Sequence, residues 1–278
     1  MMETREYLQI GENETEQIIS FINDQSGFDF SDYSMPSLIR RFQRYISLHQ
    51  ITDLSILFDD LLADNLLLNQ FIEEITVNVT EMFRDPLFFS ALRKEVLPSL
   101  SKLNHIKIWH AGCSTGEEVY SMAILLKEEG LLDKSLIYAT DINQSVLAKA
   151  KQGKFDLENM KIYAANYKES ESDGNFLSYF QIKEGWAEID SNFKERIIFS
   201  SHNLVSEGVF NQFDLIVCRN VLIYFNKDLQ NQVLETFYKS LANNAYLALG
   251  SKETLMFSSI ESRMQSLNPK WKIWKKVE

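Results

Sequence analysis

The stretch that most constrains the fold runs from residue 106 to residue 130 and reads IKIWHAGCSTGEEVYSMAILLKEEG. The apolar run at 106–109 predicts a strand, and the helical spacing of apolar residues from Glu118 to Leu126 predicts a helix. Small residues at 111–116 predict a tight turn between them. A strand, a small-residue turn and a helix in this order open nucleotide-binding α/β sheets. Glu117 and Glu118 would repel a phosphate at this helix start and attract a cation. By itself, however, such a sequence also occurs in strand–helix turns that bind no ligand.

Length and composition favour a soluble globular chain. The 278 residues are 45% hydrophobic and 24% charged, which suits one large domain and a smaller one. No apolar run reaches the roughly 18–20 residues that span a bilayer, and the start MMETREYLQIGENETEQ does not resemble a secretory signal. We therefore expect a cytoplasmic protein that is not an integral membrane protein. Cys113 and Cys218 are expected to be free buried thiols, and four scattered histidines predict no metal site.

Charge is distributed unevenly along the chain. The net charge of −11 argues against a nucleic-acid partner, because phosphate binding requires a basic surface. Residues 1–77 hold four basic and 14 acidic residues, a net charge of −10, whereas the other 201 residues have a net charge of −1. This asymmetry predicts that residues 1–77 form a separate module.

Apolar residues in that module recur at helical spacing, as at Ile18, Ile19 and Ile22, and predict a small helical domain. Its second helix is expected to begin near Pro36, where the missing N–H costs nothing. Arg40, Arg41 and Arg44 cluster on this helix. They form either a solvated helix face or a contact for an acidic partner.

A polar, β-branched connector, TVNVTEMFRDP, follows at residues 76–86. Asn78, Thr80 and Arg84 provide hydrogen-bonding groups there, between the two predicted modules. Clefts between domains are favoured places for ligand sites, although capping residues in a linker would give the same pattern. A helix is expected from Leu87 to Leu100, ending near Pro98.

Acidic and amide residues stand at the ends of the next predicted strands. Asp141 ends the strand predicted at 135–140, about 25 residues beyond the glycine turn, where a carboxylate can accept hydrogen bonds from ribose hydroxyls. An Asp after a strand is also a common helix cap, but the separation from the turn favours a nucleoside ligand. The buried strand at 213–218 ends at Arg219–Phe225, on the ligand edge of an open α/β sheet.

Residues 155–196 interrupt the alternation of strands and helices. Their alternating segment at 181–189 predicts a hairpin, and we interpret the region as a small β insertion. The segment at 271–275 predicts a terminal strand at an antiparallel edge of the sheet.

Three motifs, NVTEMFRD, AGCSTGEEVYS with ATDI, and FDLIVCRNVLIYF, together resemble the CheR-type protein-glutamate O-methyltransferases of bacterial chemotaxis. The similarity covers nearly the whole chain. It implies an α/β fold: a doubly wound Rossmann-like methyltransferase domain at 78–278 with a β-subdomain inserted at 155–196, preceded by an all-α domain at 1–77. It also implies S-adenosyl-L-methionine as cofactor, S-adenosyl-L-homocysteine as product, and no metal. The implied partners are the cytoplasmic domains of methyl-accepting chemoreceptors. The protein itself is expected to be a monomer.

Within the motifs, the resemblance assigns cofactor-binding roles to Asn78, Thr80, Arg84, Gly112, Glu117, Glu118, Asp141, Ile142, Asn203, Leu204, Asn220 and Val221. Glu118, or less favourably Glu117, would contact the methionine end of the cofactor. Asp141 would hold the ribose, Asn203–Leu204 would flank the adenine, and Asn220–Val221 would line the reactive side.

Catalytic roles fall by the same resemblance on Arg84 and Tyr224, which would face the transferred methyl group and the incoming carboxylate. Arg40, Arg41 and Arg44 would bind the receptor substrate. Two alternatives stay open: a carboxyl methyltransferase for another protein or a small acid, and a signalling module that binds the cofactor without turnover.

Overall fold

The computed structural model describes residues 7–76 and 80–277, which divide into two compact units. One unit holds the N-terminal helices together with Ile223–Gln230. The other holds the remaining chain from residue 80 to Leu222 and from Asn231 onward. The predicted boundary at residue 77 stays a prediction, because residues 77–79 lie outside the described part of the chain.

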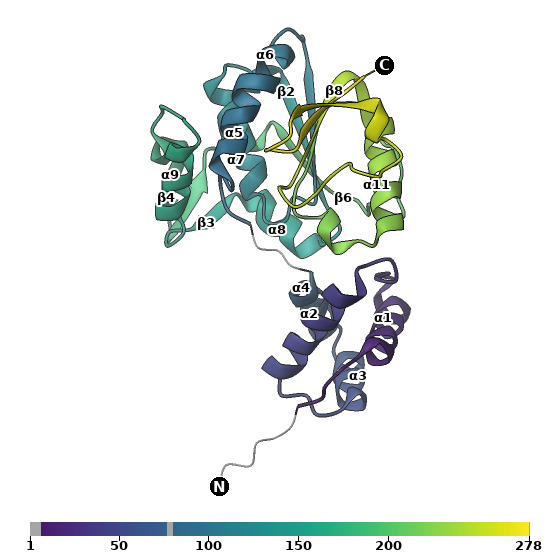
Figure 1. Cartoon of the computed structure of the whole chain (residues 1–278). Helices are drawn as coiled ribbons and strands as arrows, with labels where there is room; N and C mark the ends of the chain where they lie inside the picture. Colours follow the sequence, from purple (N-terminus) through teal and green to yellow (C-terminus); the bar gives the residue numbers. More distant parts are fainter. Residues whose placement is uncertain (1–6, 77–79, 278) are drawn as a thin grey trace. The chain divides into compact units, whose positions relative to one another are not determined.

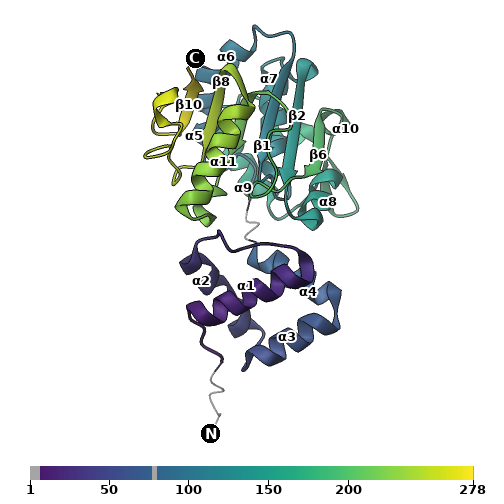
Figure 2. The same cartoon turned by 90° about the vertical axis from the view of Figure 1, so that its right-hand side faces the viewer.

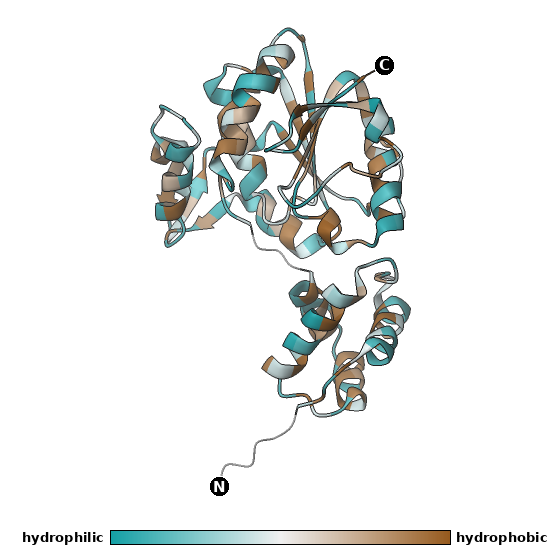
Figure 3. Cartoon of the chain, viewed as in Figure 1, coloured by the Kyte–Doolittle hydropathy of each residue, from teal (hydrophilic) through white to brown (hydrophobic). Residues whose placement is uncertain are grey.

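The N-terminal unit is helical, as predicted (Figure 1). Its helices are α1 Glu12–Ser26, α2 Met35–Leu48, α3 Leu54–Ala63 and α4 Asn65–Ile75. Pro36 stands in the first turn of α2, and Asp53 and Asp64 cap α3 and α4 by accepting a backbone N–H from Ser55 and Leu66. Each helix contributes apolar residues to one core, which includes Ile18, Phe42 and Phe71. These helices carry both hydrophobic and hydrophilic residues, the pattern expected of amphipathic helices around a small core (Figure 3).

The second unit is built on a seven-stranded sheet with the order β6-β2-β1-β7-β8-β10-β9. Strands β6, β2, β1, β7 and β8 are parallel to one another, and β10 is antiparallel to both of its neighbours. The strands are β1 Ile106–Ala111, β2 Ser135–Asp141, β6 Ile197–Ser201, β7 Phe213–Cys218, β8 Leu241–Leu249, β9 Met264–Asn268 and β10 Ile273–Lys276. Several of them lie side by side in Figure 2.

The strand order reverses between β1 and β7, as in a doubly wound fold. Helices α7 (Glu117–Glu128) and α8 (Gln144–Gln152) follow β1 and β2, whereas α11 (Lys227–Ser240) follows β7. Because parallel crossovers are right-handed, opposite directions of winding put α7 and α11 on opposite faces of the sheet, as Figure 1 shows. The carboxyl ends of β1 and β7 therefore meet at the point where such sheets bind ligands.

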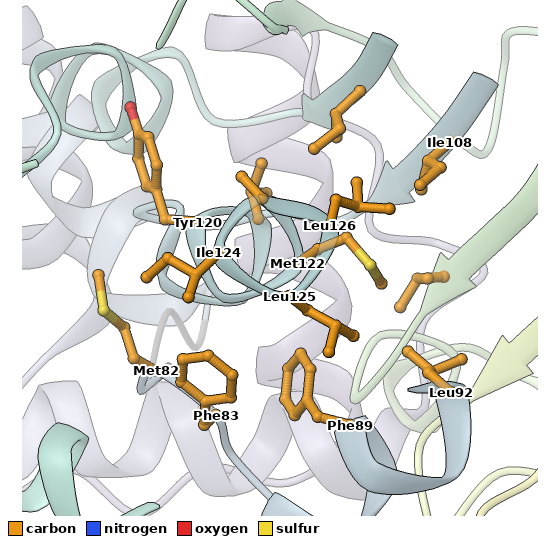
Figure 4. Close-up of a cluster of buried hydrophobic side chains, with 14 of the residues drawn as sticks. Met82, Phe83, Phe89, Leu92, Ile108, Tyr120, Met122, Ile124, Leu125 and Leu126 are labelled. Carbon is orange, nitrogen blue, oxygen red and sulfur yellow. The ribbon is translucent and has the colours of Figure 1, made fainter. Parts of the chain in front are cut away.

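Helix α7 lies in the middle of the larger core. Figure 4 shows Met82, Phe83 and Phe89 beside it, together with side chains of the helix itself such as Leu125. Most residues of α7 are buried, which explains why its sequence is apolar around most of its circumference. The residues that begin this helix at the sheet edge are thus held by a rigid element.

The helix predicted at 87–100 consists of three pieces: α5 Pro86–Ala91, the π-helical turn η1 Leu92–Val96 and α6 Leu97–Leu100. The helical stretch ends at Leu100, close to Pro98 as predicted, but it is not one regular α-helix. Because proline lacks an N–H and clashes with the preceding turn, a wider π turn before Pro98 lets the helix continue.

The predicted β insertion forms a three-stranded antiparallel sheet, β3-β5-β4. Helix α9 (Met160–Glu169) connects β3 to β4 in the sequence. Its strands are β3 Lys154–Asp156, β4 Phe180–Lys183 and β5 Trp186–Ile189, so the hairpin predicted at 181–189 is confirmed. Glu128 at the end of α7 ties this region to the core. It accepts hydrogen bonds from Tyr167 and Tyr179 and pairs with Arg93 at 2.7 Å.

The terminal strand is antiparallel as predicted, but its predicted position at the sheet edge is wrong. Strand β10 lies between β8 and β9, and β9 forms the edge. The sequence MQSLN of β9 is largely exposed and polar and gives little strand signal. Its hairpin with β10 was therefore not predicted.

Candidate functional site

The turn after β1 follows a backbone path that favours glycine. Gly112 and Gly116 have φ angles of 77° and 93°, and Ser114 has a φ of 49°. The N–H groups of Gly112 and Cys113 donate to the carbonyl of Thr140 at 2.8 and 2.9 Å, which joins this turn to the end of β2. A Cβ atom on Gly112 would lie 2.4 Å from Cγ2 of Val221. Only glycine lets the two turns approach this closely.

Asp141 lies beside this turn at the carboxyl end of β2. Its Oδ2 accepts the N–H of Ser114 at 2.9 Å, and its Oδ1 accepts the N–H of Asn143 at 3.0 Å. Burial raises the pKa of Asp141, and these backbone N–H groups reduce the effect. The half-buried carboxylate is therefore fixed in place while each oxygen retains a lone pair. Ile142 follows it and is also half-buried.

Asn203 and Leu204 begin the loop after β6, next to Asp141. The N–H of His202 donates to the carbonyl of Asp141 at 3.2 Å. The side chain of Asn203 accepts the N–H of Val205 at 2.9 Å, so it supports its own turn. Both Asn203 and Leu204 are half-buried.

The two glutamates at the start of α7 differ in environment. Glu117 is buried and accepts a hydrogen bond from Thr115 at 2.6 Å, and burial raises its pKa. The side chain of Glu118 retains 19% exposure. Its Oε1 lies 3.1 Å from Nδ1 of His110, and its Oε2 accepts from Nη1 of Arg219 at 2.8 Å.

The electrostatics of Glu118 follow from these partners. Burial alone would raise the pKa of Glu118, but the hydrogen bonds and charges of His110 and Arg219 outweigh it and lower the pKa to about 2. The carboxylate is thus a permanent negative charge at the start of α7, and its partners fix its orientation.

Asn220 and Val221 stand on the turn that follows β7. Asn220 adopts a φ of 62°, a conformation that asparagine tolerates better than most residues. Oε1 of the buried Glu253 accepts the N–H groups of Val221 and Leu222 at 2.9 and 2.8 Å, and its Oε2 accepts that of Asn220 at 3.2 Å. Glu253 therefore holds the backbone of this turn.

The segment around Arg84 is a strained turn. Phe83 and Asp85, on either side of Arg84, have φ angles of 53° and 56°, which are unusual for residues other than glycine. The N–H of Phe83 donates to Oγ of Ser121 at 2.9 Å, and the carbonyl of Met82 accepts from Asn166 at 3.0 Å. Such strain persists only where the surroundings fix it, and it is commonest at functional sites.

The carboxyl ends of β1, β2, β6 and β7 thus carry Gly112, Glu117, Glu118, Asp141, Ile142, Asn203, Leu204, Asn220 and Val221, and the Arg84 turn joins them through Arg219. Thr80 precedes the Arg84 turn and is half-buried, whereas Asn78 lies outside the described residues. Arg219 and Glu253 support this edge and were missed as site residues. Arg219 stands within the CRN segment of the third motif. A charged residue directly after a buried strand is the sequence feature that could have identified it as a site residue. Nothing comparable marks Glu253.

In the helical unit, the three predicted arginines do not share one face. Arg40 and Arg44 are exposed, whereas Arg41 is buried and donates from Nη1 to the carbonyl of Ile75 at 2.9 Å. The Arg41 guanidinium lies over the ring of Tyr224, 4.1 Å from its centroid, and burial lowers the pKa of Arg41. Tyr224 itself belongs to this unit through Ile223–Gln230.

The residues at the sheet edge fit a positively charged nucleoside. Asp141 offers acceptors for sugar hydroxyls, and Glu117 and Glu118 provide the acidic surroundings that suit a cation. Gly112 allows a ligand to approach the backbone. Within residues 7–76 and 80–277, no cluster of His, Cys, Asp or Glu side chains is suited to holding a metal ion. In the same residues, no helix has the length and apolar character needed to cross a membrane.

A doubly wound, mostly parallel sheet with a glycine-containing turn after β1 is the Rossmann-like architecture of nucleoside-binding enzymes. The family model described as the CheR methyltransferase SAM-binding domain matches residues 78–273, and the CheR methyltransferase all-alpha domain matches residues 13–76. This chain belongs to the CheR methyltransferase family.

Named relatives extend over nearly the whole chain. A protein of Pseudomonas putida named putative methyltransferase Cher3 is 42% identical over 93% of this chain and 95% of its own length. Chemotaxis protein methyltransferases of Vibrio anguillarum and Listeria monocytogenes are 31% and 32% identical. They match 94% and 83% of this chain and 96% and 86% of their own lengths.

Proposed function

We propose that this protein is a cytoplasmic protein-glutamate O-methyltransferase that esterifies glutamate side chains in the cytoplasmic helices of chemoreceptors. The observation that carries the proposal is the acidic, glycine-containing edge at β1, β2 and β7, in a chain whose family includes enzymes named for chemotaxis. Acidic residues around the turn suit a sulfonium compound rather than a phosphate.

The residues that would hold S-adenosylmethionine are Asn78, Thr80, Arg84, Gly112, Glu117, Glu118, Asp141, Ile142, Asn203, Leu204, Asn220 and Val221. Asp141 would accept hydrogen bonds from the ribose hydroxyls. Glu118, held by His110 and Arg219, would face the ammonium of the methionine end. When bound, the cofactor supplies an electrophilic methyl group on a positively charged sulfur.

The chemistry needs alignment rather than a base. A glutamate with an unperturbed pKa of about 4.3 is already ionised at neutral pH. Its oxygen would take the methyl group as the carbon–sulfur bond breaks, and the electron pair of that bond would stay on the neutral thioether. Arg84 would orient the carboxylate through charge-assisted hydrogen bonds, and Tyr224 is the second residue to which the resemblance gives a catalytic role. Holding the reacting groups in line supplies much of the rate enhancement.

Labelled methyl transfer tests this proposal. The protein is incubated with S-adenosylmethionine tritiated in the methyl group and with membranes enriched in chemoreceptors. We expect label on the receptors, which mild alkali releases as volatile methanol. A receptor whose cytoplasmic-helix glutamates are changed to alanine serves as the control. No label on any receptor would contradict the substrate assignment.

Two other activities are distinguished by additional assays. Methylation of a small carboxylic acid or of another protein, without receptor labelling, would favour a different carboxyl methyltransferase. Cofactor binding without transfer to any acceptor would favour a non-catalytic signalling module.

A further inference from the structure

Arg219 connects two parts of the candidate cofactor site that are far apart in sequence. Its Nη1 donates to Oε2 of Glu118 at 2.8 Å and to the carbonyl of Arg84 at 3.3 Å, and its Nη2 donates to Oδ2 of Asp85. The same guanidinium lies over the ring of Phe88, 4.1 Å from the centroid. The side chain of Arg219 is only 2% exposed.

The position of Arg219 follows from the sheet. It stands directly after β7, the central strand, so its backbone is fixed on a rigid element. The planar fork of an arginine can donate to two carboxylates and a carbonyl at once, which the single ammonium of lysine cannot do with the same geometry.

Arg219 contacts two parts of the candidate site, the turn that carries Arg84 and the carboxylate of Glu118. The turn that carries Arg84 has positive φ angles on both sides of Arg84, and such strain persists only where surrounding contacts hold it. Glu118 is the carboxylate expected to face the methionine end of the cofactor. One side chain therefore contacts both the Glu118 carboxylate and the turn that carries Arg84.

We propose that Arg219 is a positioning residue for cofactor binding: it orients the Glu118 carboxylate and holds the turn at 83–85 that presents Arg84. Arg219 acts through these groups and does not touch the cofactor itself. This inference rests on the proposed function, because it assigns the supported edge to S-adenosylmethionine.

Arg93 provides a matched control. It also holds a carboxylate of α7, pairing with Glu128 at 2.7 Å, but at the opposite end of that helix. Its side chain is 19% exposed and that of Glu128 is 12% exposed, so this too is a largely buried arginine pair. If both ion pairs were purely structural, losing either one should have the same effect on thermal stability and on cofactor affinity.

The test measures S-adenosylhomocysteine binding by calorimetry and thermal unfolding for the wild type, Arg219→Lys and Arg93→Lys. We expect both variants to lose some thermal stability, but only Arg219→Lys to bind the nucleoside roughly tenfold or more weakly. Asp85→Asn loosens the same contact from the partly exposed side and should weaken binding in the same direction. It serves as the decisive variant if Arg219→Lys does not fold.

A double-mutant cycle separates positioning from general stability. If Arg219 acts through Glu118, the effects of Arg219→Lys and Glu118→Gln on affinity should be less than additive, whereas Arg93→Lys and Glu118→Gln should be additive. Unchanged affinity in Arg219→Lys, or additive effects for that pair, would overturn the inference. Failure of the wild type to bind S-adenosylhomocysteine would instead refute the proposed function.

Discussion

At the scale of single residues, Glu118 shows how its surroundings set the chemistry of a carboxylate. It lies at the start of α7 between His110 and Arg219, and its pKa is lowered to about 2. A group whose pKa is lower in the folded than in the unfolded state stabilises the fold above its unfolded pKa. That contribution is lost as the pH falls towards the folded pKa, because the unfolded state takes up the proton first.

Glu118→Gln should therefore flatten the acid side of the stability profile. From an unfolded pKa of about 4.5, the wild-type carboxylate loses on the order of 1 kcal/mol of stabilisation between pH 7 and pH 3.5. The glutamine variant cannot lose this contribution, although it is less stable at neutral pH. Urea unfolding followed by circular dichroism at several pH values measures the slope. Parallel profiles for wild type and variant would contradict the assignment.

Residue types at strand ends were predictable because parallel strands present their carboxyl ends at one edge. Asp141 and Asn220 could be placed there from their positions after apolar runs. The burial of Arg41 could not be predicted, because helical spacing does not show that the carbonyl of Ile75 and the ring of Tyr224 contact its guanidinium. Long-range partners of a charged side chain depend on tertiary packing.

At the scale of elements, the turn after β7 depends on a carboxylate from a distant segment. Glu253 accepts N–H groups from Asn220, Val221 and Leu222 and from Gly250. Val221 in turn packs against Gly112 on the turn after β1. The two turns therefore form one unit that Glu253 supports.

Glu253→Gln should loosen this unit. The amide nitrogen cannot accept the backbone N–H groups that a carboxylate oxygen accepts, so buried donors are left unpaired at a cost of about 1–3 kcal/mol. We also expect weaker binding of S-adenosylhomocysteine. Denaturant unfolding and calorimetry measure the two effects.

Glu261→Gln is the matched control for that variant. Glu261 is exposed and accepts the N–H of Phe257 at 2.7 Å, in the same segment but away from the turn after β7. Its change should alter stability by less than about 0.5 kcal/mol. Equal losses in the two variants would show that Glu253 has no special role.

Elements that are long or continuous apolar segments were predicted well, as for α7 and β7. Elements that depend on partners were not: β9 has a weak pattern of its own and forms through its pairing with β10. The π turn before Pro98 likewise compensates for a proline by a rearrangement that propensity does not specify.

At the scale of the whole molecule, charge is concentrated in the helical module. Residues 1–77 have a net charge of −10, and Arg40 and Arg44 are exposed on α2. Glutamate-rich receptor helices would be repelled by most of this module, so these two arginines are the proposed contacts for the substrate.

Changing Arg40 and Arg44 together to alanine should lower kcat/KM for receptor methylation roughly tenfold, without changing cofactor affinity. Lys149→Ala with Lys151→Ala removes the same charge from an exposed stretch of α8 and is the control. Methylation rates at several salt concentrations measure both pairs. Equal loss of rate in the two pairs would indicate a general charge effect and contradict a local contact.

The proposed function depends on S-adenosylmethionine binding at the edge formed by β1, β2 and β7. A crystal structure of the protein with the product S-adenosylhomocysteine tests it most directly. We expect the nucleoside between Asp141 and the turn of Asn220–Val221, with its ribose at Asp141 and its amino-acid end near Glu118. A nucleoside bound elsewhere, or one that leaves Asp141 and Asn220 without contact, would contradict it.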